Sequence, residues 1–346
     1  SYAEATTGDP MFYLKKHLVF LVLGGVAALV ALKTPLRIWY HLAPLLLLAA
    51  LVLLVLVLVP GLGLERNGAR RWLGLGGFTF QVAEAAKAAL IIFLSAYLVR
   101  QRESLKADWI GLLKPFAVMG MFLGLLILQP DFGSIVVMAG ITVTLVFLAG
   151  IHFLRFFLVA LAGLALLTLL ATSSDYRMQR ITSFLDPWAN QFDSGYQLTQ
   201  SLIAFGRGEW FGVGLGNSLQ KLHYLPEAHT DFIFAIVAEE TGLVGSMALI
   251  LLFSLLVTRL FGLGFRAVAS GYEFAGYMVI GTATMFSVQA VINVGVACGL
   301  LPTKGLTLPF ISAGGSSLLV CMALMGICLR VSLEMGSGKA PSQVKA

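Results

Sequence analysis

Long apolar segments recur along the chain, and each is close to the ~20 residues (range ~17–25) that a helix needs to cross a bilayer. Lipid offers no partner to backbone N–H and C=O groups, so such segments are predicted to be helices. Together they predict an all-α polytopic membrane protein, with residues 1–346 forming a single transmembrane domain. Nine segments can be delimited: His17–Leu32, Leu42–Pro60, Phe80–Val99, Leu112–Gln129, Ser134–Ile151, Phe153–Ala171, Asp231–Val257, Tyr272–Cys298 and Ser316–Glu334.

Composition agrees with this pattern, because 58% of the residues are hydrophobic and only 12% are charged. Soluble proteins carry roughly 25% charged residues, so a cytosolic enzyme, a secreted disulfide scaffold and a disordered protein are excluded. The net charge of +6 is spread over short loops, whereas nucleic-acid binding needs a basic cluster. The distribution of these basic residues favours an orientation with the C-terminus in the cytoplasm. The cysteines lie in apolar segments, where they act as small hydrophobes.

Residues 172–230 are predicted to form a large extracytoplasmic loop, a polar segment in which Trp and Tyr are interspersed among charged residues. Long ordered loops are usually lids or binding surfaces, and a solvated connector is the alternative. Within it, Gly212, Gly214 and Gly216 are predicted to be tight turns, since the βαβ unit of a phosphate loop is missing. A short amphipathic helix along the membrane interface is predicted from the helical spacing of Tyr196, Leu198, Leu202, Ile203 and Phe205.

Charged side chains inside predicted spans are costly and are therefore functional candidates. Glu84 and Lys87 stand three residues apart on one helix face, where they can pair. We interpret them as an ion pair that fixes helix packing. Glu239 and Glu240 lie two to three turns inside another span, and a structural role is expected for them too.

Asp231 opens a predicted span directly after a polar run. Its carboxylate either faces a cavity, where it takes a proton or holds a cation, or only complements the helix dipole. His229 lies two residues away and does not share a helix face with Asp231, so a metal pair is weakly indicated. Further along, Lys304 precedes a Gly/Pro-rich stretch that leads to Ser316 and Ser317. Helix N-termini bind phosphates, although a glycine-rich helix start explains the same pattern.

Several stretches, in one order along nearly the whole chain, resemble the FtsW/RodA (SEDS) family of membrane glycosyltransferases. The chain departs from the family at Val82, where a proline is usual, and at Ala313, where a tyrosine is usual. The family has ten spans, so the resemblance implies one further span before Ser1. The stretches that carry the resemblance are Gly68–Trp72 (GARRW), Gln81–Lys87 (QVAEAAK), Gln129–Gly133 (QPDFG), Ser194–Gly208 (SGYQLTQSLIAFGRG), Gly212–Glu240 and Gly299–Ser317 (GLLPTKGLTLPFISAGGSS).

The resemblance, which is stronger to the division branch of the family, implies a peptidoglycan glycosyltransferase that polymerises lipid II at the outer face of the cytoplasmic membrane. It implies Asp231 as the catalytic base, acting directly or through a divalent cation (Mg or Mn), with no organic cofactor. Its implied substrate-binding residues are Lys304, Arg71, Ser316, Ser317, Glu227 and His229.

The resemblance also implies partners at the division septum: a class B penicillin-binding transpeptidase (FtsI) and the FtsQ–FtsL–FtsB complex. No nucleic acid is expected. Small residues let helices approach closely in lipid, so the transpeptidase span is predicted to pack on Ala275, Gly276, Gly281 and Ala283. A lipid II flippase or transporter and a non-catalytic division scaffold are the alternative functions.

Overall fold

The computed structural model describes residues 11–66, 68–75, 78–172 and 175–336. The chain divides into two compact units. We name one the bundle unit (Val19–Phe157, Leu256–Val288 and Gly315–Ala346) and the other the loop unit (Ser1–Leu18, Leu158–Leu255 and Gln289–Gly314).

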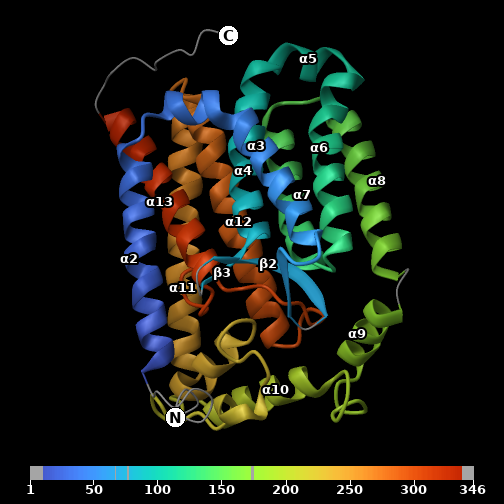
Figure 1. The fold of residues 1–346 in the computed structure, drawn as a ribbon, viewed down its shortest axis with the longest axis vertical. Helices are drawn as coiled ribbons and strands as arrows, with labels where there is room; N and C mark the ends of the chain where they lie inside the picture. The colour runs from blue at the N-terminus through green and yellow to red at the C-terminus, as the bar shows by residue number, and fades with distance from the viewer. Residues whose placement is uncertain (1–10, 67, 76–77, 173–174, 337–346) are drawn as a thin grey trace. The chain divides into compact units, whose positions relative to one another are not determined.

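All nine predicted apolar segments are helical, and each coincides with one of the labelled helices in Figure 1. Within the described residues, seven helices are long and apolar enough to cross a membrane; Phe132–Leu148 and Phe153–Leu166 are shorter apolar helices. The protein is therefore a multi-pass membrane protein. The helices are α2 (Phe12–Lys33), α3 (Leu36–Leu58), α4 (Val82–Arg100), α6 (Trp109–Leu128), α7 (Phe132–Leu148), α8 (Phe153–Thr172), α11 (Ile233–Ala269), α12 (Glu273–Ala297) and α13 (Gly315–Gly336).

In the bundle unit, α4 packs against α3, α7 and α13, and α6 packs against α7 (Figure 1). Helix α4 is buried around most of its circumference, as expected for a helix whose apolar residues are distributed around all sides. The short helix α5 (Arg102–Ala107) connects α4 to α6.

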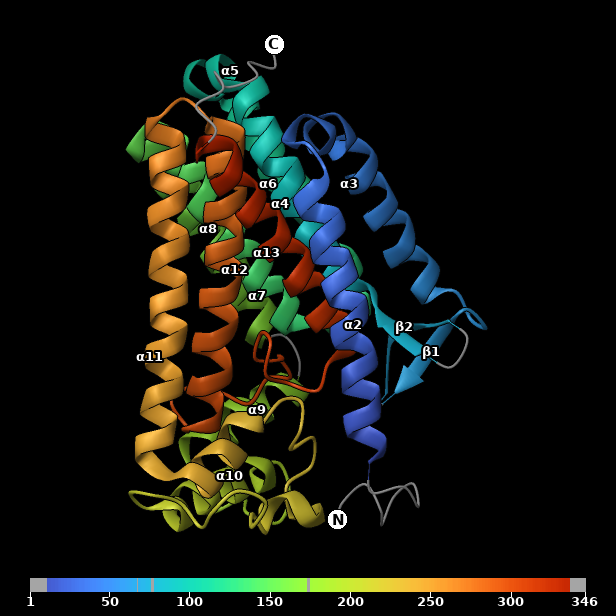
Figure 2. The same ribbon diagram turned by 90° about the vertical axis from the view of Figure 1, so that its left-hand side faces the viewer.

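A three-stranded antiparallel sheet, which the apolar pattern did not predict, connects α3 to α4. Its strands β1 (Gly63–Arg66), β2 (Ala69–Leu75) and β3 (Phe78–Gln81) lie in the order β1-β2-β3. Trp72 on β2 pairs with Leu64 on β1 and with Gln81 on β3. Figure 2 shows β1 and β2 beside the end of α3, which both strands contact. The sheet fixes how the chain enters α4.

The small residues of α12 do not form an open surface for a partner span, so that prediction is wrong. Ala275 and Ala283 are buried inside the bundle unit. A Cβ added to Gly276 would lie 2.8 Å from the carbonyl oxygen of Gly264 on α11, and one added to Gly281 would lie 2.9 Å from a methyl group of Ile91 on α4. These residues instead allow close packing among the chain's own helices.

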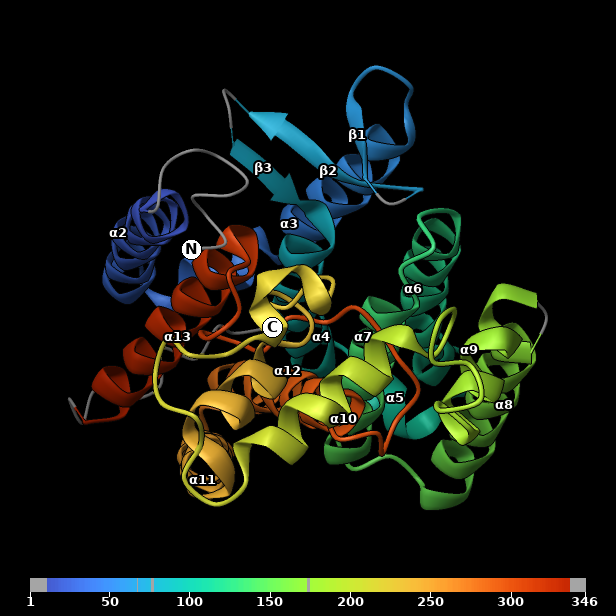
Figure 3. The ribbon, with the colours of Figure 1, turned by 90° about the horizontal axis from the view of Figure 1, so that it is seen from below.

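The loop unit contains α9 (Asp175–Leu185), α10 (Tyr196–Gly208) and the single π-helical turn η1 (Gln220–Tyr224). Helix α10 confirms the predicted amphipathic helix, and it lies across the axis of α11 (Figure 3). Helix α11 extends twelve residues beyond the predicted end at Val257, and its helical conformation is interrupted at Gly242. Gly212, Gly214 and Gly216 all have positive φ, which confirms the predicted turns.

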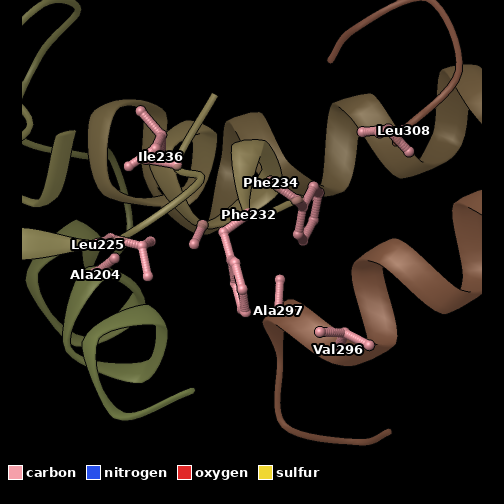
Figure 4. Close-up of a cluster of buried hydrophobic side chains, with 10 residues drawn as sticks. Ala204, Leu225, Phe232, Phe234, Ile236, Val296, Ala297 and Leu308 are labelled. Carbon is pink, nitrogen blue, oxygen red and sulfur yellow. The ribbon is translucent and has the colours of Figure 1, made fainter. Parts of the chain in front are cut away.

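One buried apolar cluster forms the core of the loop unit and includes residues from the start of α11 (Figure 4). Phe232 is 2% exposed, and Figure 4 shows its ring pointing toward Ala297 at the end of α12. The cluster anchors the chain directly after Asp231. Its members include Ala204, Leu225, Ala228, Phe232, Phe234, Ala235, Ile236, Val296, Ala297 and Leu308.

Candidate functional site

Asp231 lies in a tight turn, two residues before the first residue of α11, and its side chain is partly exposed. The turn begins at Glu227, which adopts the left-handed φ of 54°. The Glu227 carbonyl accepts hydrogen bonds from the N–H groups of Thr230 (3.1 Å), Asp231 (3.1 Å) and Phe232 (3.3 Å). This local bonding orders the backbone on the N-terminal side of α11.

Distant residues fix the same turn a second time. Three consecutive carbonyls of the turn accept long-range hydrogen bonds: His229 from Ala313 N–H (2.9 Å), Thr230 from Ser312 Oγ (2.6 Å) and Asp231 from Asn293 Nδ2 (2.8 Å). Two of these donors are held in place by further hydrogen bonds. Asn293 of α12 also donates to the Leu306 carbonyl (2.7 Å), and the Ser312 hydroxyl accepts from the Leu308 N–H (2.8 Å).

The loop between α12 and α13 passes directly beside the Asp231 carboxylate. A Cβ built on Gly305 would lie 2.7 Å from Asp231 Oδ2. Lys304, the residue before it, is partly exposed. The loop unit therefore brings together four of the candidate residues: Glu227, His229 and Asp231 in the turn, and Lys304 in the loop that the turn binds.

Arg71 lies in the bundle unit, on β2. Its Nε donates to the Gln129 carbonyl (2.9 Å) and its Nη2 to the Pro130 carbonyl (2.7 Å). Asp131, the next residue, caps α7 by accepting from the N–H (3.1 Å) and hydroxyl (2.9 Å) of Ser134. The guanidinium is thus fixed on the turn that precedes α7.

Ser316 and Ser317 lie in the first turn of α13, as predicted, but both are buried. Ser316 Oγ accepts from the Gln81 N–H (2.9 Å) and donates to the Thr79 carbonyl (3.3 Å). This hydroxyl therefore connects β3 to α13. Phosphate binding by the two serines stays a prediction.

Glu84 and Lys87 form the expected pair, with 2.7 Å between Lys87 Nζ and Glu84 Oε1. Both side chains are almost completely buried in the bundle unit. Removing either partner would leave an uncompensated buried charge, so each side chain requires the other.

Glu239 is a fully buried carboxylate in the loop unit, and it organises the chain between α10 and α11. It accepts from Arg207 Nη1 (2.5 Å), from the Ser218 hydroxyl, and from the N–H groups of Leu219 (3.2 Å) and Gln220 (3.3 Å). Four donors of this kind compensate for the desolvation of one carboxylate. The sequence singled out the glutamate, but its donors lie 19–32 residues away.

The interruption of α11 at Gly242 is filled by the backbone of residues 209–214. In a continuous helix, the carbonyls of Glu239 and Glu240 would accept from the N–H groups of Leu243 and Val244. Here these four groups bond to residues 209–214, so they keep hydrogen-bond partners. Gly242 has φ 67° and ψ −165°, a conformation open essentially to glycine alone. The four hydrogen bonds are Val213 N–H to Glu239 O (3.0 Å), Gly214 N–H to Glu240 O (3.1 Å), Leu243 N–H to Glu209 O (2.9 Å) and Val244 N–H to Trp210 O (3.1 Å).

Around Asp231, the described residues contain no group of three or more His, Cys, Asp or Glu side chains that could hold a metal ion. Side chains of these four types alone therefore do not complete a divalent-cation site among the described residues. Magnesium commonly uses one or two carboxylates and takes its other ligands from water and substrate phosphates.

The helices and the hydrogen-bonded turn define a polytopic α-helical membrane protein with a preorganised carboxylate in its loop unit. The sequence profile of the FtsW/RodA/SpoVE family, described as "Cell cycle protein", matches residues 1–336. The chain belongs to this family.

Curated relatives and solved structures agree with the profile. The chain is 53% identical over 334 residues to the "Probable peptidoglycan glycosyltransferase FtsW" of Saccharophagus degradans, covering 96% of this chain and 86% of the relative. It is 47% identical over 332 residues to the protein of the same name from Pseudomonas fluorescens, covering 96% and 82%.

Among solved structures, the rod shape determining protein RodA of Thermus thermophilus superposes with a TM-score of 0.70 and 32% identity, covering 96% of this chain and 91% of RodA. A chain from a structure described as "Structural coordination of polymerization and crosslinking by a peptidoglycan synthase complex" gives a TM-score of 0.78 and 33% identity, covering 96% and 93%.

Proposed function

We propose that this chain is a peptidoglycan glycosyltransferase of cell division that polymerises lipid II into glycan strands. One observation carries the proposal: Asp231 offers a partly exposed carboxylate on a turn whose backbone is held by three consecutive long-range hydrogen bonds. Catalytic groups need such preorganisation, because a misplacement of about 1 Å costs on the order of 10²-fold in rate. The names of the relatives at 53% and 47% identity support the reaction class.

In the proposed reaction, the 4-hydroxyl of the acceptor sugar attacks the anomeric carbon of the lipid-linked donor. A carbon–oxygen bond forms on the face opposite the pyrophosphate, so the α-linkage becomes a β-linkage. The hydroxyl proton passes to the Asp231 carboxylate, which acts as general base. Undecaprenyl pyrophosphate leaves with the electron pair of the broken bond.

The departing pyrophosphate needs positive charge and N–H donors, which stabilise developing negative charge in the transition state. Lys304 is the candidate from the loop unit, since the adjacent Gly305 lies against Asp231. Arg71 and the N-terminus of α13 are candidates from the bundle unit. The proposed substrate-binding residues are Lys304, Arg71, Ser316, Ser317, Glu227 and His229.

A divalent cation, Mg or Mn, is a further part of the proposal. Asp231 would supply one ligand, and substrate pyrophosphate oxygens would supply others, as is common for magnesium. The cation would offset phosphate charge. Titration with Mg or Mn after chelation by EDTA tests this directly: polymerisation that is indifferent to EDTA rejects the cation and leaves Asp231 as the base.

We further propose that the chain acts in the cytoplasmic (inner) membrane at the septum, with its active face outward. Its proposed partners are a class B penicillin-binding transpeptidase (FtsI) and the FtsQ–FtsL–FtsB complex. The peptidoglycan synthase complex among the structural neighbours supports a partner of this general kind.

The deciding experiment measures glycan polymerisation on lipid II by the full chain together with its transpeptidase partner. Asp231→Asn keeps the side-chain shape and the three backbone hydrogen bonds, so the variant should fold and bind its partner. Its turnover should fall by roughly 10²–10⁴-fold, the usual contribution of a general base.

Asp193→Asn is the matched control, because it removes the same charge from an exposed position of the same unit. It should polymerise like the wild type. Folded Asp231→Asn protein that polymerises at the wild-type rate would reject the assignment. Wild-type protein that moves lipid II between leaflets without making glycan would instead identify a flippase.

A further inference from the structure

Gly305 is a glycine for a reason other than backbone conformation. Its φ does not fall in the left-handed region that nine other glycines of the described chain occupy. The three atoms nearest to an added Cβ all belong to a side chain, so the glycine does not serve the close approach of two backbones either. An alanine could therefore adopt this backbone without strain.

The space beside Gly305 is occupied by one side chain. The three atoms nearest to a Cβ at this position all belong to Asp231: Oδ2 at 2.7 Å, Cγ at 3.4 Å and Oδ1 at 3.8 Å. Real Cβ atoms essentially never approach a heavy atom to less than 3.0 Å. The missing side chain of Gly305 is thus what leaves room for the observed carboxylate position.

The two backbones cannot easily separate to make room for a methyl group. Asn293, which is 1% exposed, donates from one Nδ2 to the carbonyl of Asp231 (2.8 Å) and to the carbonyl of Leu306 (2.7 Å). The Ser312 hydroxyl bonds the neighbouring Thr230 carbonyl (2.6 Å). A Cβ at Gly305 must therefore be accommodated by rotation of the Asp231 side chain.

From this geometry we propose that Gly305 is a positioning residue, which sets the direction of the Asp231 carboxylate at the acceptor hydroxyl, and that Asn293 fixes the spacing on which this depends. The inference rests on the proposed function, because it names a residue that acts through the proposed base. Gly305 itself touches no reacting atom.

The test is Gly305→Ala in the full chain with its transpeptidase partner, assayed on lipid II. The kcat should fall by about 10- to 100-fold, since a rotated carboxylate is misplaced by about 1 Å or more. The KM for lipid II should stay within about twofold of the wild-type value, because no binding group is removed. Gly206→Ala is the matched control: Gly206 is an exposed helical glycine of the same unit with nothing within 4 Å of its added Cβ, and its kcat should be unchanged.

A second measurement tests the contact without reference to activity. Thermal unfolding midpoints are compared for Gly305→Ala in the wild-type and in the Asp231→Ala background. If the methyl group conflicts with the carboxylate, any decrease caused by Gly305→Ala should disappear when the carboxylate is absent. An equal decrease in both backgrounds would overturn the proposal.

The outcomes also separate this inference from the proposed function. A Gly305→Ala enzyme with wild-type kcat, alongside an inactive Asp231→Asn enzyme, overturns the role of Gly305 and leaves Asp231 as the base. An active Asp231→Asn enzyme rejects the proposed base itself, and the role of Gly305 with it. A kcat that falls in Gly305→Ala but not in Gly206→Ala, with unchanged KM, supports the inference.

Discussion

Replacing either member of the Glu84–Lys87 pair by methionine should destabilise the protein by about 3–5 kcal/mol, because it leaves one uncompensated charge in the bundle unit. This energy lies in the upper part of the usual range for breaking an ion pair. The structure justifies it, because the Glu84 and Lys87 side chains are 3% and 0% exposed and their charged atoms are 2.7 Å apart. The double change Glu84→Met with Lys87→Met leaves no buried charge. It should return the stability to within about 1 kcal/mol of the wild type, because an apolar pair of similar volume is often neutral.

The charge swap Glu84→Lys with Lys87→Glu should be intermediate. It restores an ion pair, but it places the cation in the first turn of α4, where the helix dipole disfavours a positive charge by about 0.3–1 kcal/mol. Arg102→Met is the control: it breaks the Arg102–Glu273 pair, whose arginine is 56% exposed, and should cost no more than about 1 kcal/mol.

The unfolding midpoints of all five variants are measured in detergent, with size-exclusion fluorescence as the readout. Lipid II polymerisation is assayed on those that fold. A double methionine variant as unstable as the sum of the two single variants would refute the pairing argument. A stable double variant that cannot polymerise would show that the pair has a chemical role in addition to its structural one.

Three further changes test other parts of the structure. Gly242→Ala should destabilise the loop unit by about 1–3 kcal/mol, since alanine is strained at this φ and ψ, and limited proteolysis should then cleave between α10 and α11 faster. Arg207→Gln should lower the unfolding midpoint by depriving buried Glu239 of its charged donor, and Glu239→Gln in the same protein should recover part of the loss. Phe232→Ala should cost about 3–5 kcal/mol by opening a cavity in the apolar cluster, measured by the same unfolding assay.

The membrane-spanning helices could be predicted because each apolar run carries its own signal. The end of α11 could not be predicted, because Arg259 and Arg266 end the apolar run although the helix continues to Ala269. The strands β1 and β3 are only four residues long. Strand β1 (GLER) shows no clear alternation. Strand β3 (FTFQ) does alternate, but its Phe80 was taken as the start of the predicted span Phe80–Val99.

Single residues of the candidate site could be predicted from the sequence, but the contacts that bring them together could not. Asp231 was identifiable as a charge at the start of a span. Its hydrogen-bond donors Asn293 and Ser312 lie 62 and 82 residues from their partners in the chain, and no local pattern connects such positions. Asn293 did carry one usable signal, as a polar amide within an apolar helix.

The α11 break has a consequence for how freely the chain can vary. Its four hydrogen bonds are all between main-chain atoms, so they place no demand on side-chain identity. Phe211 is 82% exposed, whereas Gly212, Gly214 and Gly242 have positive φ values at which a side chain is strained. Phe211 is therefore a suitable attachment point for a fluorophore that reports on the junction, and a library across residues 209–214 should retain folded members wherever Gly212 and Gly214 are kept.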